Sequence, residues 1–171
     1  MKAIIDACIN HQIPGTVAVV ISNKQDAAGL NLAKEYGIST LFIDPKKYDS
    51  KESYEIALSE ALETYKLDLV CLAGYMKILG KHFIEKYRGK LINIHPSLLP
   101  EFKGLDTHQR AIDANATQHG ATVHLVTAAL DDGPIILQAE LSMSPHDNAE
   151  KLAARVLLLE HQLYPFVLKS L

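Results

Sequence analysis

The sequence predicts an α/β fold of three layers, in which helices cover both faces of a mostly parallel sheet. Short apolar runs of strand length alternate with longer stretches of helical periodicity along the chain. With 171 residues, 48% of them apolar and 22% charged, the chain can bury a substantial core. No repeat, low-complexity tract or linker-like stretch divides it. We therefore expect a single domain that spans residues 1–171.

The first half of the chain alternates predicted helices with predicted strands. Helical periodicity starts at Lys2, and Gly37 is typical of the residue that ends a helix. One of residues 23–26 is expected to cap the helix before Gly37. Asp49 with Glu52 forms a capping-box pattern for a later helix. The predicted elements are helix 2–10, strand 16–22, a helix ending at 37, strand 38–43, helix 49–65, strand 67–74 and helix 79–87.

The second half begins with a short β-branched run, Leu91 to Ile94, that is expected to form a central buried strand. Two later runs, 121–127 and 135–143, alternate in part between apolar and polar residues, as strands do that pair at a sheet edge. Helices are predicted at 107–115 and after Asn148, which can cap the last one. Pro165 is expected to kink or restart that final helix.

Asn93 and His95 are the first candidate functional residues, because they project from one face of the central strand at its end. Pro96 must end the strand, since proline has no N–H for a sheet ladder. Open parallel sheets hold their ligands at the carboxyl ends of the strands. An amide that donates to a developing oxyanion would lie there beside an imidazole that moves a proton. The alternative is an ordinary strand end with a hydrogen-bonded Asn and His.

Asp131 is the candidate partner of His95, because it lies in an Asp-Asp-Gly-Pro turn that lets the backbone bend close to a ligand. A carboxylate beside an imidazole favours the protonated ring. The alternative is that Asp131 only shapes the turn. His124, in the middle of a predicted strand beside the site, is expected to contact residues of the site rather than the substrates. His108 and His119 are expected to be hydrogen-bonded scaffold.

The stretch from Gly74 to Leu79 follows a predicted strand and therefore also lies at the carboxyl edge of the sheet. Its tyrosine, methionine and aliphatic side chains suit a flat heterocycle, and its backbone groups suit the polar edge of such a ring. The alternative is a helix start that packs on the core.

Composition argues against several functional classes. The formal net charge is −3 and no basic block is present, so we expect neither nucleic acid nor a membrane as partner. The eight histidines share no close spacing with cysteine, so no metal is expected. Cys8 and Cys71 lie in apolar contexts and are expected to be reduced thiols of a cytoplasmic protein. No signal peptide or membrane span is recognisable.

The run Asn-Ile-His-Pro-Ser-Leu-Leu-Pro at 93–100, followed by Gly104, resembles the signature of the folate-dependent formyltransferases. Residues 130–134 resemble the second signature of that superfamily, with Asp132 where a glycine is more usual. Within the superfamily, residues 74–138 are most similar to the glycinamide ribonucleotide formyltransferases of purine synthesis. The likeness runs from residue 2 to about residue 168 and implies a Rossmann-like formyltransferase fold.

This resemblance implies that a formyl group passes from the co-substrate 10-formyltetrahydrofolate to the amine of glycinamide ribonucleotide, without a metal. It implies that Asn93 donates a hydrogen bond to the oxyanion and that His95 is the general acid. It also implies that Asp131 orients the His95 ring and favours its protonated form. Both substrates are small molecules, and the enzyme is expected to be a monomer or homodimer. The positions that match the family's folate site are Lys51, Met76, Lys77, Ile78, Leu79 and Asn93, and Glu160 matches a carboxylate that contacts the ribonucleotide.

The chain departs from this family at its N-terminus. In the resembling enzymes, a strand and a Gly-rich phosphate loop precede the helix that corresponds to residues 2–10. We therefore expect that Met1 is an internal or mis-assigned start, and that residues 1–171 alone are unstable and bind the ribonucleotide poorly. The alternative function is accordingly a folate-binding, catalytically impaired fragment of a formyltransferase.

Overall fold

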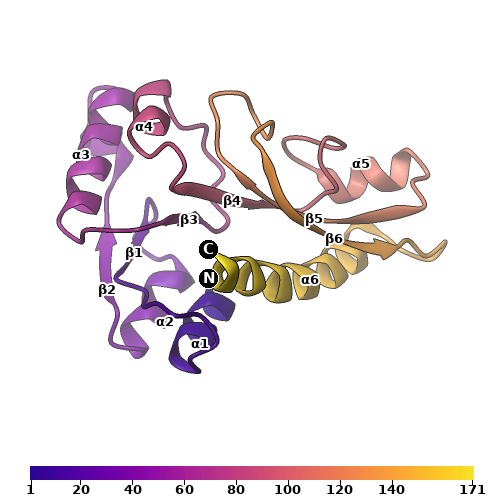
Figure 1. The fold of residues 1–171 in the computed structure, drawn as a ribbon. Helices are drawn as coiled ribbons and strands as arrows, with labels where there is room; N and C mark the ends of the chain where they lie inside the picture. Colours follow the sequence, from indigo (N-terminus) through magenta and orange to yellow (C-terminus); the bar gives the residue numbers. More distant parts are fainter.

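The computed structural model describes all residues 1–171, and its helices and strands follow the predicted order (Figure 1). This order confirms the predicted α/β class. The elements are α1 (Lys2–Ile9), β1 (Val19–Ser22), α2 (Ala28–Glu35), β2 (Ser39–Phe42), the short 3-10 helix η1 (Pro45–Lys47), α3 (Lys51–Glu63), β3 (Val70–Leu72), α4 (Lys81–Lys86), β4 (Leu91–His95), α5 (Thr107–Asp113), β5 (Gln118–Leu125), β6 (Ile135–Ser142) and α6 (Ala149–Ser170).

The strands form two sheets. β1 and β2 pair in parallel, and the larger sheet has the order β3-β4-β5-β6. In the larger sheet β3 and β4 are parallel, whereas β4–β5 and β5–β6 are antiparallel, and β6 lies at the edge. No backbone ladder joins the two sheets, so strands that the sequence analysis places in one sheet lie in two. β4 is paired on both sides and occupies the interior of the larger sheet.

Two predicted helix starts differ from the structure. The capping box of α3 is formed by Ser50 and Ser53, and each side-chain oxygen accepts the backbone N–H of the other residue at 3.1 Å. The predicted box of Asp49 and Glu52 is therefore wrong by one residue, because the extended backbone that a cap requires is that of Ser50. α2 begins without a side-chain cap, so the cap predicted among residues 23–26 is not formed.

Pro165 is predicted to kink or restart the final helix, and the restart does not occur, because α6 is one uninterrupted helix. Proline cannot donate to the carbonyl four residues earlier, which here belongs to the solvent-exposed His161. Water can satisfy that carbonyl, so the helix continues to its end. Asn148 caps α6 as predicted, with its side-chain oxygen accepting the N–H of Lys151 at 2.8 Å. Neither α6 nor any other helix is long and apolar enough to cross a membrane.

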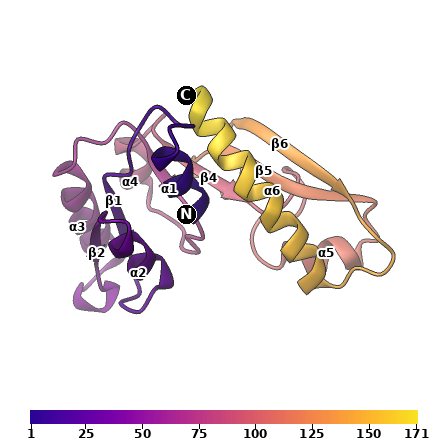
Figure 2. The same ribbon diagram turned by 90° about the horizontal axis from the view of Figure 1, so that it is seen from below.

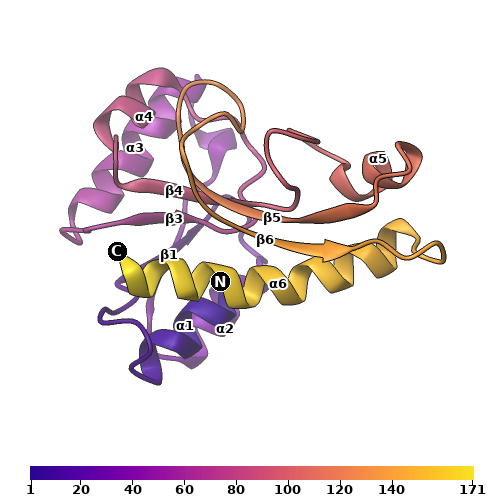
Figure 3. The same ribbon diagram turned by 45° about the vertical axis from the view of Figure 1, so that its right-hand side comes forward.

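Two apolar clusters hold the layers together. α6 packs along β5 and β6 (Figure 3), where its Leu152 is fully buried, and α1 packs against α6 (Figure 2). The second cluster joins α3, α4 and β4 through Tyr54, Phe83 and Leu91. Leu91 belongs to the second cluster and Ile92 to the first, so successive side chains of β4 are buried on opposite faces of the sheet.

Tyr164 connects α6 to the larger sheet, because its hydroxyl donates to the carbonyl oxygens of Leu72 and Ile92, each at 3.1 Å. Tyr164→Phe removes this donor from two carbonyls, and we expect the free energy of unfolding to fall by about 1–3 kcal/mol. Urea unfolding followed by circular dichroism measures the change. The control is Ser170→Ala, which removes an exposed hydroxyl from the same helix and should change stability by less than about 0.5 kcal/mol. Equal losses in both variants would contradict the role of Tyr164.

Candidate active site

β4 carries the predicted site residues into the interior of the larger sheet. It pairs with β3 on one side and with β5 on the other, and it ends at His95, immediately before Pro96. In the antiparallel ladder, Asn93 lies opposite His124 and His95 lies opposite Thr122. Side chains of directly opposite residues share a face of the sheet. β5 therefore adds polar side chains to the strand end that the sequence predicted.

His124 orients the amide of Asn93. The Nδ1–H of His124 donates to the Leu125 carbonyl at 3.0 Å, so in the neutral ring Nε2 carries the lone pair. Burial lowers the pKa of His124, which favours that neutral form. The lone pair accepts Asn93 Nδ2–H at 3.2 Å. The second N–H of the Asn93 amide has no partner in the protein and is free to donate to a ligand.

His95 lies between two hydrogen-bond acceptors. Its Nε2–H donates to the Phe102 carbonyl at 3.0 Å, and its Nδ1 lies 3.4 Å from Asp131 Oδ2. The residue is 5% exposed, so water does little to screen these contacts. A carbonyl and a carboxylate can only accept, so each ring nitrogen of His95 faces a hydrogen-bond acceptor.

Asp131 faces both imidazole rings from the connection between β5 and β6. Its Oδ2 accepts the N–H of Gly104 at 2.9 Å, and its Oδ1 lies 3.8 Å from His124 Nε2. Its backbone φ of 46° is left-handed, a region that aspartate adopts more readily than most residues. The turn that the sequence identified thus carries Asp131 to His95. Asn93, His95, His124 and Asp131 form one contact cluster, which we call the polar cluster.

Asp132, which stands where a glycine is more usual, has a different environment from its neighbour. Its side chain is 57% exposed and forms an ion pair with Lys103 in the loop after β4. The hydrogen bond from Lys103 lowers the pKa of the Asp132 carboxyl. The second carboxylate of the turn is therefore paired at the surface, and Asp131 is the carboxylate that faces His95.

The loop after β4 is anchored by two polar side chains that the sequence analysis did not single out. Thr122 Oγ1 donates to the Ser97 carbonyl at 2.7 Å and accepts the N–H of Leu99 at 3.0 Å. Gln138 Nε2 donates to Thr122 Oγ1 and to the Leu99 carbonyl, each at 2.9 Å. Thr122 and Gln138 are register partners on β5 and β6. Two polar residues on strands that are predicted to pair at the sheet edge are a pattern that could have identified them.

His108 and His119 support the far end of this loop. His108 Nδ1 lies 3.1 Å from His119 Nε2, and the Phe102 ring packs edge-on against the His119 ring at 5.9 Å between centroids. His119 is 1% exposed, and burial lowers its pKa to about 4. Its Nδ1 has no hydrogen-bond partner in the protein. The neutral ring is thus a packing support for Phe102, whose carbonyl contacts His95.

A cavity of about 660 Å³ is lined by residues from η1, α3 and the segment that follows β3. β3 ends at Leu72, which lies opposite Asn93 in the parallel ladder, so the cavity segment leaves the sheet beside the polar cluster. Of the residues predicted to bind folate, Leu79 lies in the core and Asn93 in the polar cluster. The structure brings the other four to the cavity, namely Lys51, Met76, Lys77 and Ile78.

Aromatic side chains and one buried carboxylate also line this cavity. The sequence analysis placed Tyr75 in the stretch 74–79 and missed Tyr48, Tyr54 and Glu55. Lys77 Nζ lies 5.9 Å from the centroid of the Tyr54 ring, and Lys51 Nζ lies 3.7 Å from Glu55 Oε1. Lys51, Tyr54 and Glu55 follow the i, i+3, i+4 spacing that places residues on one face of a helix. That spacing could have identified the last two.

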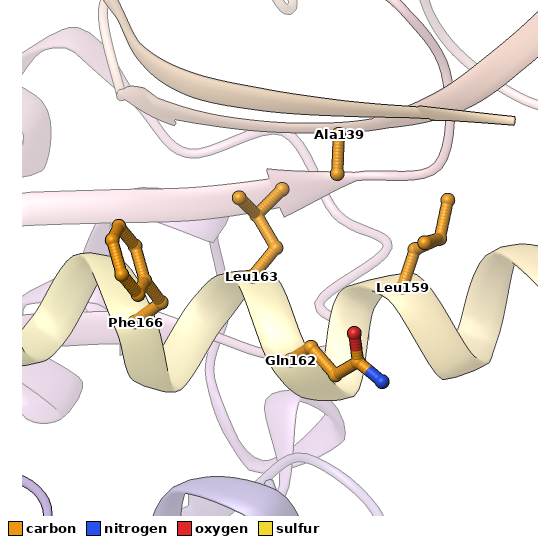
Figure 4. Close-up of a pocket in the computed structure, with 5 residues that line it drawn as sticks. All are labelled: Ala139, Leu159, Gln162, Leu163 and Phe166. Carbon is orange, nitrogen blue, oxygen red and sulfur yellow. The ribbon is translucent and has the colours of Figure 1, made fainter.

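A second cavity, of about 190 Å³, lies between α6 and β6 (Figure 4). Figure 4 shows Leu159 and Leu163 pointing from the helix toward the strand that carries Ala139. Gln162 and Phe166 complete the lining, which contains no titratable group. This cavity is therefore not a candidate for the chemistry of the polar cluster.

Glu160 lies on α6, and no hydrogen bond or ion pair connects it to the polar cluster. Burial raises the pKa of its carboxyl, and the amino group of Met1 is its charged neighbour. No group of three or more His, Cys, Asp or Glu side chains is arranged to hold a metal ion.

The sequence pattern of the formyl transferase family matches residues 1–168. The phosphoribosylglycinamide formyltransferase of Escherichia coli is 45% identical over 168 residues, which cover 98% of this chain and 79% of that protein. The trifunctional purine biosynthetic protein adenosine-3 of Homo sapiens is 40% identical over 99% of this chain, which corresponds to 17% of its own length.

Solved structures share the fold described above. Glycinamide ribonucleotide transformylase 1 from Symbiobacterium toebii matches with a TM-score of 0.96 at 44% identity, covering 98% of this chain and 79% of that one. The phosphoribosylglycinamide formyltransferase from Brucella melitensis matches with a TM-score of 0.95 at 48% identity, covering 99% of this chain and 88% of that one.

The buried His119 is expected to make stability pH-dependent. Its pKa is about 4 in the folded protein and 6.5 for an unperturbed histidine, so between these values the unfolded chain binds the extra proton. The free energy of unfolding should therefore fall as pH falls from 6.5 toward 4, with at most about 1.4 kcal/mol per pH unit from this ring. Urea unfolding at several pH values gives the free energy of unfolding as a function of pH, and this dependence should be weaker in His119→Gln than in the wild-type protein. His82→Gln, at an exposed position, should keep the wild-type slope. An unchanged slope in His119→Gln would contradict the assignment.

Proposed function

Because the chain belongs to the formyl transferase family, we propose that it transfers the formyl group of 10-formyltetrahydrofolate to the amine of N1-(5-phosphoribosyl)glycinamide. This reaction is a step of de novo purine (IMP) biosynthesis, and the human relative is named a purine biosynthetic protein. The observation that carries the proposal is the polar cluster, in which an amide, two imidazoles and a carboxylate meet at the end of β4. Formyl transfer needs a donor for the developing oxyanion and a proton donor, and this cluster contains both.

Asn93 supplies the oxyanion donor. Its Nδ2 is held by His124, and the remaining N–H is free to donate to the formyl oxygen as negative charge develops there. Because the amide is oriented before the reaction, it need not reorganise as charge develops. A single donor of this kind typically lowers the barrier by about 2.7–4 kcal/mol.

The substrate amine attacks the formyl carbon, and the bond between this carbon and the folate nitrogen then breaks. His95 supplies the proton that the departing folate nitrogen takes up, and the proton lost by the attacking amine replaces it. Its Nε2–H is engaged by the Phe102 carbonyl, so the proton that can leave is the one on Nδ1, on the side of Asp131. The distance of 3.4 Å to Asp131 Oδ2 is longer than a strong charge-assisted hydrogen bond, which leaves this proton available to a substrate or to a relaying water. Asp131 stabilises the charged ring and fixes its orientation. General acid catalysis of this kind typically contributes about 10²–10⁴-fold.

The 660 Å³ cavity fits the co-substrate, which supplies an activated formyl group when bound. The cavity segment starts beside Asn93, so a ligand in the cavity can reach the polar cluster. Met76 and Ile78 are 73% and 63% exposed, and apolar side chains exposed beside a cavity suit a flat ring. Lys51 and Lys77 would hold the carboxylates of the glutamyl tail.

Glu160 is proposed to bind the ribonucleotide. A partly buried carboxylate accepts hydrogen bonds from hydroxyl groups, which the ribose of this substrate offers. No metal is needed in this mechanism, since the Asn93 amide stabilises the negative charge on the formyl oxygen and His95 donates the proton. Both substrates are small molecules.

The alternative, a folate-binding but catalytically impaired fragment, is less favoured. The relatives with 45% and 48% identity are named as formyltransferases, and the polar cluster of this chain contains all three residues assigned to the chemistry. A transfer assay with glycinamide ribonucleotide, run beside a binding assay with a reduced folate, distinguishes the two. Binding without transfer would favour the fragment.

His95→Ala tests the central assignment. Removal of the proton donor should lower kcat/KM for formyl transfer by about 10²–10⁴-fold, whereas binding of a reduced folate should be retained because the cavity lies outside this ring. Transfer is followed by the absorbance change of the folate, and binding by calorimetry. The exposed His82→Gln serves as the control and should keep wild-type activity. Wild-type turnover in His95→Ala would refute the mechanism.

The adjacent carboxylates of the turn form a matched pair of variants. Asp131→Asn removes the charge that faces His95 and should lower kcat by about 10²-fold or more. Asp132→Asn removes an equal charge from an exposed ion pair and should lower kcat less than about three-fold. Steady-state kinetics at saturating substrates compares them. Similar losses in the two variants would mean that net charge near the site, rather than the contact with His95, is what matters.

A further inference from the structure

The segment between β3 and α4, residues 73–80, forms one wall of the 660 Å³ cavity but has few backbone hydrogen bonds. From residue 73 to residue 79, its backbone N–H and C=O groups make no hydrogen bond with other backbone groups of the protein. Met76 and Ile78 are exposed, and Leu79 is buried in the core. The segment therefore takes its position from side-chain contacts, namely Tyr75 against the second apolar cluster and Lys77 against the Tyr54 ring, and from the contacts at its ends.

Glu55 holds the end of this segment that leads into α4. Its side chain is buried, and its Oε1 accepts the N–H of Gly80 at 2.8 Å. Lys51, one turn earlier on α3, places its Nζ 3.7 Å from the same oxygen. α3 starts with a capping box and packs into the second apolar cluster, so the carboxylate is carried by a fixed element.

Gly80 admits this carboxylate because it has no side chain. A Cβ at this position would lie 2.4 Å from Glu55 Oε2, closer than real Cβ contacts come. The backbone angles of Gly80, φ −75° and ψ 156°, are open to any residue, so glycine is not needed here for its conformational freedom. The absence of a side chain at Gly80 therefore leaves the space that the Glu55 carboxylate occupies.

We propose that Glu55 is a positioning residue for formyl folate, which fixes the cavity wall formed by residues 73–80 through the N–H of Gly80. The inference rests on the proposed function, which assigns the cavity to this co-substrate. Glu55 does not touch the reacting atoms, since these belong to the polar cluster at the end of β4. Its effect is on pre-organisation: a wall that is already in place need not be ordered when the ligand binds.

Glu55→Ala is the direct test. Loss of a hydrogen bond to a charged acceptor should raise the KM for formyl folate about ten-fold or more, while kcat and the KM for the ribonucleotide change little. Glu55→Gln keeps an acceptor oxygen and should stay within about three-fold of wild type. Glu60→Ala removes an exposed carboxylate from the same helix and serves as the control. An unchanged KM in Glu55→Ala overturns the proposal.

Gly80→Ala tests the match of shapes without removing the carboxylate. In the wild-type background the added Cβ displaces the carboxylate end of Glu55 and weakens its hydrogen bond to the Gly80 N–H, so the KM for formyl folate should rise, by less than in Glu55→Ala. In a Glu55→Asp background the shorter side chain leaves room, and the same change should have less than about a three-fold effect. Equal effects in the two backgrounds would overturn the proposed coupling.

Hydrogen exchange separates this proposal from the proposed function. The exchange of the Gly80 amide is measured without ligand, and Glu55→Ala should accelerate it about ten-fold or more relative to Glu60→Ala. Active wild-type protein with unchanged KM and unchanged exchange in Glu55→Ala rejects the positioning role alone. Wild-type protein that neither binds nor uses formyl folate rejects the proposed function, and with it the assignment of the cavity.

Discussion

The site depends on β4, a strand that is hydrogen-bonded on both sides until a proline stops it. Because Pro96 cannot donate to a ladder, the strand ends at His95 and the chain turns away from the sheet there. Pairing with β5 sets Asn93 opposite His124, and pairing with β3 sets Asn93 opposite Leu72, from which the cavity segment leaves. The two neighbours of one strand thus fix the relation between the polar cluster and the cavity.

What the sequence could predict here is what depends on local rules. The position of Asn93 and His95 on one face at a strand end follows from the two-residue period of a strand and from the proline after it, whereas their assigned roles came from the resemblance. The carbonyl of Phe102 could not be foreseen, because its approach to His95 Nε2 depends on a left-handed φ of 52° at a residue other than glycine. The α/β class follows from periodicity in the same way, whereas the division of the strands into two sheets depends on pairing between distant segments, which periodicity does not specify.

Sequence neighbours end in different environments at two points of the site. Asp131 faces the imidazoles, whereas Asp132 pairs with Lys103 at the surface. Ile78 is 63% exposed beside the cavity, whereas Leu79 is 6% exposed in the core. A resemblance assigns roles by position in a motif and treats such neighbours alike. The direction of each side chain is decided by the folded backbone, so the structure was needed to separate them.

The alternation of β5 has a consequence for how the chain tolerates changes in length. Thr122 anchors the loop after β4, and His124, two residues later, orients Asn93. One residue inserted or deleted between them would turn one of the two to the opposite face of the sheet, and either the loop anchor or the amide orientation would be lost. Length variation among related chains should therefore collect in surface connections, such as the one between α5 and β5, and spare this strand.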